Sequence, residues 1–282
     1  MHTAPQDNHQ ASSLGRRAFL GTVGGLAAAS AATLLVPPAA GASARITRTE
    51  LPKSMQAPAS SALVSFSAID GTPVYYWRSN PGNQNPVTWR CTQEFLDTLV
   101  VWIRELRSIS QQAGYGGIEY LVSAGFYVNK PGQHGAGTAM DLDVVQWASG
   151  QVSSPLNRDH TSSDDAVARR YLAVEATLRR QFCYVLDGWY PDHADHFHAD
   201  FASMPPLLRT GSQSATFFIQ ATCNRFQGSG LAIDGIWGPN TQREYDRMRS
   251  TLGITGDPTA DIAVYRDLLH KIALHGFANT PF

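Results

Sequence analysis

Two short segments, residues 139–144 and 196–201, alternate polar and apolar side chains in the pattern of half-buried β-strands. Ala139, Asp141 and Asp143 alternate with Met140, Leu142 and Val144, and His196, His198 and Asp200 alternate with Phe197, Ala199 and Phe201. Because successive side chains of a strand point to opposite faces, each polar set must share one face. Two such strands lying side by side would bring imidazole and carboxylate groups together on one face of a sheet.

Histidines gather in the same two parts of the chain. Four of the seven histidines after residue 44 are His134, His193, His196 and His198, and the chain as a whole is only 16% charged. Crowding imidazole and carboxylate groups is costly without a partner, and a divalent cation would be such a partner. His134 stands in a turn that Gly135 and Gly137 make possible, so it can approach the polar face of the two strands.

The donor types in these segments suit a catalytic metal ion. Three protein ligands of mixed nitrogen and oxygen type, with a fourth position open to water, are typical of catalytic zinc. Asp195 could then accept the proton of the attacking water, while His196 could orient or donate to the oxyanion. His193 is a candidate for supporting the ligands from outside the metal's own contacts. Spacing alone does not decide whether His196 or His198 is the ligand, and surface histidines or a structural or adventitious metal site remain the alternative.

The two segments resemble the motifs of zinc D-alanyl-D-alanine carboxypeptidases and related peptidoglycan peptidases, H-x-x-G-x-A-x-D followed by D-H-x-H. Every fixed position is matched, by His134, Gly137, Ala139, Asp141, Asp195, His196 and His198. The resemblance covers about residues 90 to 201. It implies one zinc ion held by His134, Asp141 and His198, with Asp195 as the catalytic base and His196 beside the metal.

One departure from that family concerns the substrate's carboxylate. Its members usually carry an arginine a few residues before the first motif, but residues 125–130 contain no arginine and end in Lys130. A lysine offers a point charge without the bidentate fork of a guanidinium. This favours an endopeptidase over a carboxypeptidase without excluding either one.

A second motif lies near the end of the sequence. Residues 234–241 read D-G-I-W-G-P-N-T and are similar to the D-G-x-x-G-P-x-T signature of three-helix peptidoglycan-binding modules, and Ile219 and Gln220 fit the same family. Helices are expected near 215–227, 239–252 and 258–275, the last two opened by Pro239 and Pro258. A purely structural helical appendage is the alternative.

The N-terminal 44 residues look like a twin-arginine export signal. Arg16 and Arg17 precede a small and apolar run from Gly21 to Val36, and Ala42-Ser43-Ala44 offers a cleavage site. The expected organisation is a signal peptide at 1–44, a zinc peptidase domain at 45–202, a linker at 203–214 and a helical domain at 215–282. An uncleaved anchor is the alternative to export with cleavage.

Periodicity predicts an α+β fold in which a small antiparallel sheet is flanked by helices, followed by a small three-helix domain. Apolar side chains recur at helical spacing over residues 92–109 and again from Val167 to Phe182. Strands are expected at 118–125, 138–146, 183–187 and 196–201, with a hairpin over about 64–77 that turns at Asp70-Gly71.

Charge and cysteine content limit the partners. The chain has 22 basic and 23 acidic residues, and removing the leader leaves 20 and 22, a net charge of −2. With no basic surplus, nucleic acid is not an expected partner. We expect a monomer with no stable membrane association after cleavage of the signal. At most one disulfide can form; Cys91 with Cys183 is the favoured pair, and three buried thiols are the alternative.

These features together predict an exported protein, secreted or associated with the cell wall, whose partner is peptidoglycan. The expected reaction is hydrolysis of a D-Ala-containing amide bond, either by trimming a terminal D-Ala or by splitting a cross-link. The competing hypothesis is a catalytically silent wall-binding protein that keeps the peptidase fold. Asp195 distinguishes the two, because a silent protein has no need of a base beside three ligands.

Overall fold

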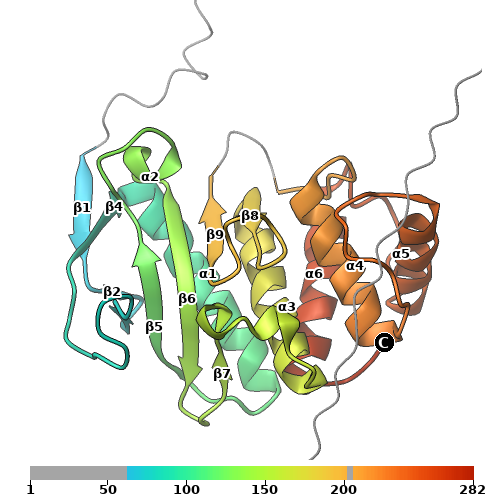
Figure 1. The fold of residues 1–282 in the computed structure, drawn as a ribbon, viewed down its shortest axis with the longest axis horizontal. Coiled ribbons are helices and arrows are strands. Elements are labelled where there is room, and N and C mark those ends of the chain that lie inside the picture. Colours follow the sequence, from blue (N-terminus) through green and yellow to red (C-terminus); the bar gives the residue numbers. More distant parts are fainter. Residues whose placement is uncertain (1–61, 202–205) are drawn as a thin grey trace, which may run out of the picture. The chain divides into compact units, whose positions relative to one another are not determined.

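The computed structural model describes residues 62–201 and 206–282, which belong to one compact unit (Figure 1). The expected signal peptide and the first part of the expected linker lie outside the described residues. Within the described ranges, no helix is both long and apolar enough to cross a membrane.

The main sheet has seven strands, ordered β2-β3-β5-β6-β9-β8, with β7 also paired to β6. The strands are β2 Ala68–Ile69, β3 Thr72–Tyr75, β5 Ile118–Gly125, β6 Ala139–Trp147, β7 Val152–Ser153, β8 Tyr184–Leu186 and β9 Phe197–Asp200. Among the described strand pairs only β3 with β5 is parallel. The expected mixture of helices with a mainly antiparallel sheet is therefore confirmed, with one parallel pair at its β3 edge.

The expected hairpin is only partly correct. Asp70 and Gly71 both have positive φ, 46° and 79°, and join β2 to β3 as a tight two-residue turn. The strand β1 (Leu63–Phe66) does not belong to that hairpin, because it pairs with β4 (Trp89–Thr92) in a separate two-stranded sheet. Alternation could identify these strands, but it could not identify their partners.

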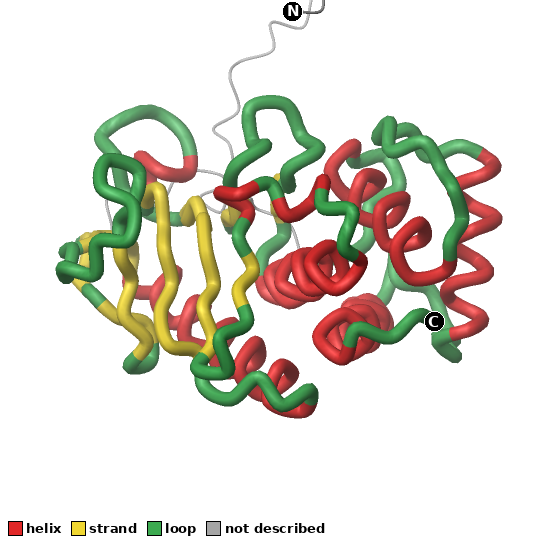
Figure 2. Tube along the Cα trace, turned by 60° about the horizontal axis from the view of Figure 1, so that its bottom comes forward, coloured by secondary structure: helices red, strands yellow, loops and turns green. Residues whose placement is uncertain are grey.

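Two long helices, α1 (Gln93–Gln112) and α3 (Asp165–Gln181), lie against one face of the main sheet (Figures 1 and 2). Thr92 begins α1, since its hydroxyl accepts the backbone N–H of Phe95, and Asp164 begins α3 by accepting that of Ala166. The apolar side of α1 is fully buried in the core. The opposite face of the sheet therefore remains for polar residues.

Three helices follow in the C-terminal part: α4 (Gln213–Gln227), α5 (Pro239–Thr251) and α6 (Ile262–Ala278). All three expected helices are present, and Pro239 opens α5 as predicted. The start of α6 was predicted too early, because the carboxylate of Asp261 accepts the N–H groups of Ala263 and Val264 and caps the helix there. Pro258 precedes this cap.

Helix α6 shares a core with the sheet. At Gly276 an added Cβ would lie 2.6 Å from the backbone oxygen of Arg169 on α3, so α6 and α3 are in direct backbone contact there. The ring of Phe277 packs 5.4 Å from Tyr115 and 5.7 Å from Trp147. These helices are therefore built onto the sheet's own helices; their status as a separate domain remains a prediction.

The favoured disulfide is wrong. Cys91, Cys183 and Cys223 are all thiols in the structure. Cys91 is fully buried in β4, and burial raises the pKa of its thiol to about 12. Cys183 lies elsewhere, with its sulfur against the backbone oxygen of Phe201. The sequence could not place these two side chains relative to each other.

Candidate metal centre

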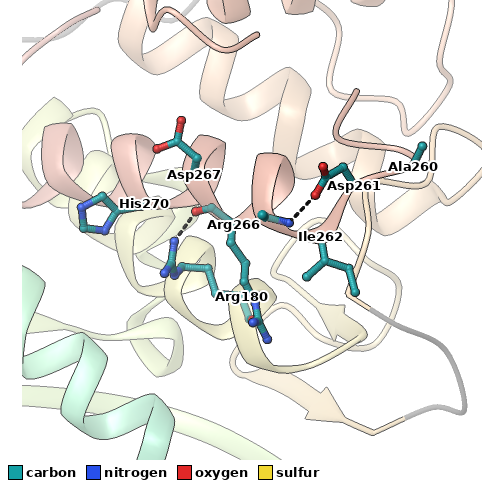
Figure 3. A pocket seen from close by; sticks show the side chains of 8 residues that line it. Arg180, Ala260, Asp261, Ile262, Arg266, Asp267 and His270 are labelled. Atoms are coloured by element: carbon teal, nitrogen blue, oxygen red, sulfur yellow. Dashed lines mark hydrogen bonds between the residues drawn. The ribbon is translucent and has the colours of Figure 1, made fainter. Parts of the chain in front are cut away.

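A wide hollow of about 870 Å³ lies over the start of α6 and is not the candidate site (Figure 3). Its charged groups are already engaged within the fold. Arg180 pairs with Glu105 and donates to the backbone oxygen of Arg266, whose own Nε donates back to the oxygen of Arg180. Asp261 caps the helix. Only His270 adds a titratable ring, so the hollow brings no set of reactive groups together.

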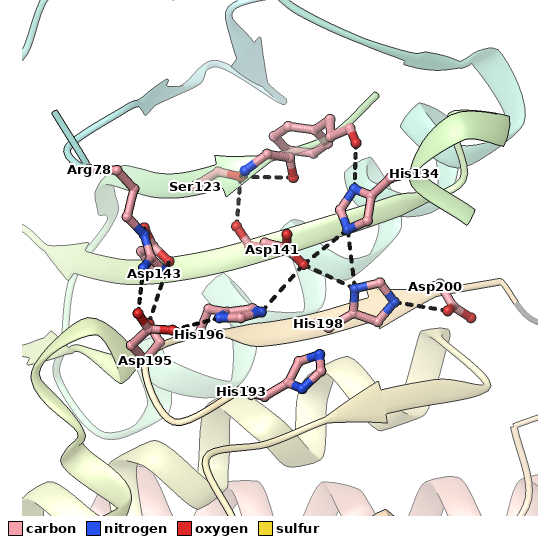
Figure 4. A network of polar contacts seen from close by, with 12 residues as sticks. Arg78, Ser123, His134, Asp141, Asp143, His193, Asp195, His196, His198 and Asp200 are labelled. Carbon is pink, nitrogen blue, oxygen red and sulfur yellow. Dashed lines mark hydrogen bonds and ion pairs between the residues drawn. The ribbon is translucent and has the colours of Figure 1, made fainter. Parts of the chain in front are cut away.

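The polar face of the sheet holds a different arrangement (Figure 4). His134 stands on the short helix α2 (Gln133–Ala136), Asp141 on β6 and His198 on β9, directly opposite Asp141. The Oδ1 atom of Asp141 lies 3.1 Å from Nε2 of His134 and 3.0 Å from Nδ1 of His198, and the two nitrogens are 3.3 Å apart. These three side chains could hold a metal ion.

The spacing of the three ligand atoms fits a small tetrahedral cation. Zinc–nitrogen and zinc–oxygen bonds of about 2.0–2.1 Å place neighbouring ligands of a tetrahedron about 3.3 Å apart. The observed separations of 3.0 to 3.3 Å agree with that edge length. Three acceptor atoms at such a distance repel one another unless a proton or a cation lies between them.

Each imidazole is held by a hydrogen bond on the side away from the cluster. Nδ1 of His134 lies 2.5 Å from the backbone oxygen of Phe126, and Nε2 of His198 lies 2.9 Å from Oδ2 of Asp200. With a cation bound, each outer nitrogen would donate its N–H to these partners, and each inner nitrogen would direct a lone pair at the cation instead of sharing a proton with Asp141. Oriented imidazoles of this kind are typical of metal ligands.

The charges around His198 stabilise positive charge at this place. Burial lowers the pKa of His198, but hydrogen bonds to Asp141 and Asp200 outweigh it and raise that pKa to about 9. Burial likewise raises the pKa of Asp141, and the hydrogen bonds from His134 and His198 bring it well below the usual range. A bound cation would satisfy the same carboxylates without a proton.

The glycine-rich turn positions His134 as expected. Gly137 has φ 73°, and a Cβ there would lie 2.6 Å from a side-chain carbon of Leu63. At Gly135 an added Cβ would lie 1.6 Å from the backbone oxygen of Lys130. Only glycine fits at these two positions, because the turn packs its backbone tightly against its neighbours.

Asp195 lies beside the cluster on the loop before β9. Its Oδ1 accepts from Nδ1 of His196 at 2.8 Å, and its Oδ2 accepts from Nη1 of Arg78 at 2.5 Å (Figure 4). Partial burial raises the pKa of Asp195, but Arg78 and His196 outweigh this effect and lower it to about 2. Its side chain is 40% exposed, so the ionised carboxylate of Asp195 is accessible to solvent.

The structure separates the roles that spacing left open between His196 and His198. His198 belongs to the converging group, whereas Nε2 of His196 is 3.8 Å from Oδ1 of Asp141 and its Nδ1 is engaged by Asp195. His193 lies next to both, with its ring 4.8 Å from that of His196 and 5.9 Å from that of His198. Its Nδ1 contacts the backbone oxygen of Pro191 at 2.7 Å.

Two contributors were not foreseen from the sequence. Arg78 follows β3 and reaches Asp143 through Nε and Nη2, at 2.8 and 2.7 Å, as well as Asp195. No sequence signal marks it, since its partners lie 65 and 117 residues away. Asp200 could have been found, because strand alternation placed it on the face of His198. Lys130, the only cationic residue in 125–130, is exposed.

The aromatic residues near the predicted strands divide between core and loop. Trp147 is fully buried, and its indole N–H donates to the hydroxyl of Ser110. Trp189 packs its ring 5.1 Å from His160. Tyr190 lies 5.6 Å from the ring of His193, so among these three aromatic residues it is the one next to the histidine cluster.

The D-G-I-W-G-P-N-T segment is organised by Gln220. The amide nitrogen of this buried side chain donates to Asp234, to the backbone oxygen of Ile236 and to Thr241, and its oxygen accepts two backbone N–H groups. The polar residues of the motif therefore build the turn. What the turn exposes is the side chain of Ile236, at 67%.

Comparisons with protein-family models, with curated proteins and with solved structures give no match. The functional interpretation rests on the residues and geometry described above.

Proposed function

We propose that this protein is an exported zinc-dependent peptidase that hydrolyses a D-Ala-containing amide bond in the peptide part of peptidoglycan. The observation that carries the proposal is the convergence of three acceptor atoms, from His134, Asp141 and His198, next to the ionised carboxylate of Asp195. These are the residues to which the resemblance of the motifs assigns the ligand and base roles. No other group of histidine, cysteine or acidic residues within the described ranges converges in this way.

His134, Asp141 and His198 would hold the zinc ion, with Asp200 and the backbone oxygen of Phe126 fixing the two rings. When bound, the ion supplies Lewis-acid activation of a water molecule and of the substrate carbonyl. Three protein ligands leave a coordination position for that chemistry. The donor set of two nitrogens and one oxygen suits zinc, although cobalt and nickel accept the same ligands.

Asp195 is the residue that would take a proton from the attacking water. Its carboxylate is ionised at neutral pH, because Arg78 and His196 hold its pKa at about 2. The same two hydrogen bonds fix the direction in which its free lone pairs point, which is what a general base needs before its basicity matters.

Arg78 is a positioning residue in this mechanism. Its guanidinium spans two carboxylates, Asp143 on β6 and Asp195 on the catalytic loop, and so ties the loop to the sheet. His196 holds the other oxygen of Asp195. We assign His196 to orienting the base, because its Nδ1 is already committed to that carboxylate.

Two bonds are candidates for cleavage: the one that releases a terminal D-Ala and the one that joins two stem peptides. A carboxypeptidase needs a cation for the free carboxylate of a terminal D-Ala. Arg78 is engaged by Asp143 and Asp195, and Lys130 is an exposed lysine without a guanidinium fork. This distribution favours cleavage of a cross-link over trimming of a terminal residue.

The cell wall as the place of action is inferred from two further segments. The twin-arginine-type leader indicates export, and the D-G-I-W-G-P-N-T turn resembles that of wall-binding modules. Because α6 packs directly on α3, the C-terminal helices are fixed to the rest of the fold. A wall contact at the D-G-I-W-G-P-N-T turn would therefore also fix the position of the catalytic face.

Digestion of purified sacculi tests the proposal. Zinc-loaded wild-type protein should release fragments that mass spectrometry identifies as free D-Ala or as split dimers, and Asp195→Ala should release neither. Asp192→Asn, an exchange in the same loop, is the matched control and should cleave as wild type. Binding to sacculi without any released fragment, in wild type and Asp195→Ala alike, would instead establish the catalytically silent wall-binding protein.

A further inference from the structure

Three aromatic side chains form a cluster that the proposed mechanism does not use. The ring of Tyr120 on β5 lies 5.5 Å from that of Tyr75 on β3 and 5.7 Å from that of Trp77, which follows β3. All three side chains are partly exposed. We call Tyr75, Trp77 and Tyr120 the aromatic platform.

The platform lies on the catalytic face of the sheet. Val74 and Leu121 are fully buried in the core, so their neighbours Tyr75 and Tyr120 point to the other face. The hydroxyl of Tyr120 donates to Oε1 of Gln146 at 3.5 Å, which places Gln146 on that face as well. Asp141 shares this face, since the residues that flank it in β6 are in the core.

Arg78 connects the platform to the metal centre. It follows Trp77 directly in the chain and reaches both Asp143 and Asp195. Along β5 the register sets Gly125 opposite Asp141 and Tyr120 opposite Gln146, five residues further on. The register is irregular between these positions, which lets residues five apart share a face and shortens the path. At about 3.4 Å per residue, the platform therefore begins at most about 17 Å along the strand from Asp141.

This separation matches the size of a stem peptide. Four extended residues span at most about 14 Å, and the acyl link that joins the stem to its sugar adds to this length. A stem peptide cut near its end at the metal centre would therefore place the group attached to its other end near the platform. In peptidoglycan that group is a sugar of the glycan strand, joined through a short acyl link.

We propose that the aromatic platform binds the N-acetylated sugar ring at the head of the stem peptide. The inference rests on the proposed function and extends it, because it makes glycan-linked peptide the preferred substrate over free peptide. The stem would lie along β5 and β6, with its scissile bond at Asp141 and its sugar against Tyr75, Trp77 and Tyr120.

The chemistry of the platform suits an uncharged sugar. The C–H groups of a pyranose ring pack against aromatic faces, while its hydroxyl and acetamido groups need hydrogen-bond partners at the edges. The hydroxyl groups of Tyr75 and Tyr120 lie at the edges of their rings and could serve as such partners. The platform contains no acidic or basic side chain, whereas the acidic groups of a stem peptide would favour a cationic surface.

The test compares two substrates with the same stem peptide, one carrying its sugars and one without them. For zinc-loaded wild type we expect a clearly higher kcat/KM with the sugar-bearing substrate. Stacking on an aromatic side chain is of the order that changes an affinity about three- to tenfold. Tyr120→Ala should therefore lower the ratio of the two kcat/KM values by about that factor. Tyr120→Phe, which keeps the ring, should retain most of the ratio.

Val101→Ala, at an exposed apolar position of α1, is the matched control and should leave the ratio unchanged. Thermal unfolding of every variant shows whether its fold is intact. Equal kcat/KM values for the two substrates in wild type, or a ratio that Tyr120→Ala does not change, would overturn the sugar site while leaving the peptidase in place. Failure of wild type to cleave either substrate would overturn both proposals together.

Discussion

Two clusters of ionisable residues in this molecule arrange their side chains in opposite ways. One is the candidate metal centre on the polar face of the sheet. The other is a buried network at α3, in which Glu175 and Asp187 are fully buried beside Arg179. Nε of Arg179 donates to Glu175 at 2.8 Å, and its Nη2 reaches Ser214 and lies 3.7 Å from Asp187.

The difference lies in where the acceptor atoms point. In the buried network the carboxylates surround a guanidinium, so the positive charge is part of the chain. In the candidate metal centre the ligand atoms of His134, Asp141 and His198 point at one another. The other nitrogen of each imidazole points away from the cluster to its own partner. A cluster of charged residues is therefore not by itself a ligand site; the direction of its lone pairs decides.

Removing a metal ligand should give the largest effect. Asp141→Asn is expected to lower peptidase activity by at least about 10³-fold, because Lewis-acid activation contributes several kcal/mol to the barrier. The metal-free variant should still unfold cooperatively, since Asp141 lies outside the hydrophobic core. Steady-state kinetics with zinc and calorimetry without it measure the two. Activity retained in Asp141→Asn would show that the cluster of His134, Asp141 and His198 does not need all three ligands, and so would contradict the contrast with the buried network.

Removing the buried cation Arg179 should lower stability and leave zinc binding intact. Arg179→Met leaves two buried carboxyl groups without their partner, which typically costs about 3–5 kcal/mol of stability. Urea unfolding measures this loss, and the folded fraction should still bind zinc. Arg104→Met is the control, because Arg104 pairs with Asp70 at the surface and such pairs contribute about 1 kcal/mol or less. Equal stability of Arg179→Met and wild type would contradict the assignment.

Burial of His160 should make the stability of the protein depend on pH. His160 packs beneath Gly188, where burial, assisted by Arg158, lowers its pKa from 6.5 to about 4. Between those pH values the unfolded chain binds more protons than the folded one, so stability rises with pH. The contribution of His160 to the free energy of unfolding is complete above about pH 6.5 and is lost as pH falls towards 4. It amounts to at most about 3 kcal/mol.

His160→Phe keeps the ring and removes the titration. The difference in unfolding free energy between wild type and His160→Phe should therefore shift in favour of the variant as pH falls from 7 to 5. Parallel stability curves over this range would show that His160 does not titrate as its burial indicates.

The smallest expected effect concerns the partner of His198. Asp200→Asn should weaken zinc binding by about 10- to 100-fold, because the carboxylate orients the imidazole and increases its basicity. Competition with a chromogenic chelator measures the affinity. Asp192→Asn, in the loop before β9, should bind zinc as wild type does. An unchanged affinity in Asp200→Asn would show that the ring is held by other contacts.

The sequence predicted the parts of the site that depend on local pattern. Strand alternation placed Asp141 and His198 on one face, and the glycines of the turn accounted for the approach of His134. It could not determine that His198 uses Nδ1, because that depends on the partner of the other nitrogen, Asp200. Arg78 was missed since its contacts are entirely tertiary.

For the fold, too, local features could be predicted from the sequence and tertiary contacts could not. The limits of β5 were predicted without error, and α1 and α3 were found from their apolar spacing. The pairing of β1 with β4, the parallel pair β3–β5 and the packing of α6 on α3 were not foreseen. These features join residues distant in the sequence, and a single sequence carries no local signal for them.

The most direct test of the central claim is the zinc content of the purified protein. After loading and dialysis, elemental analysis of wild type should give one zinc ion per chain, and His198→Ala, with an unchanged circular dichroism spectrum, should retain almost none. Wild type without bound zinc after that treatment, or equal zinc content in wild type and His198→Ala, would contradict the account.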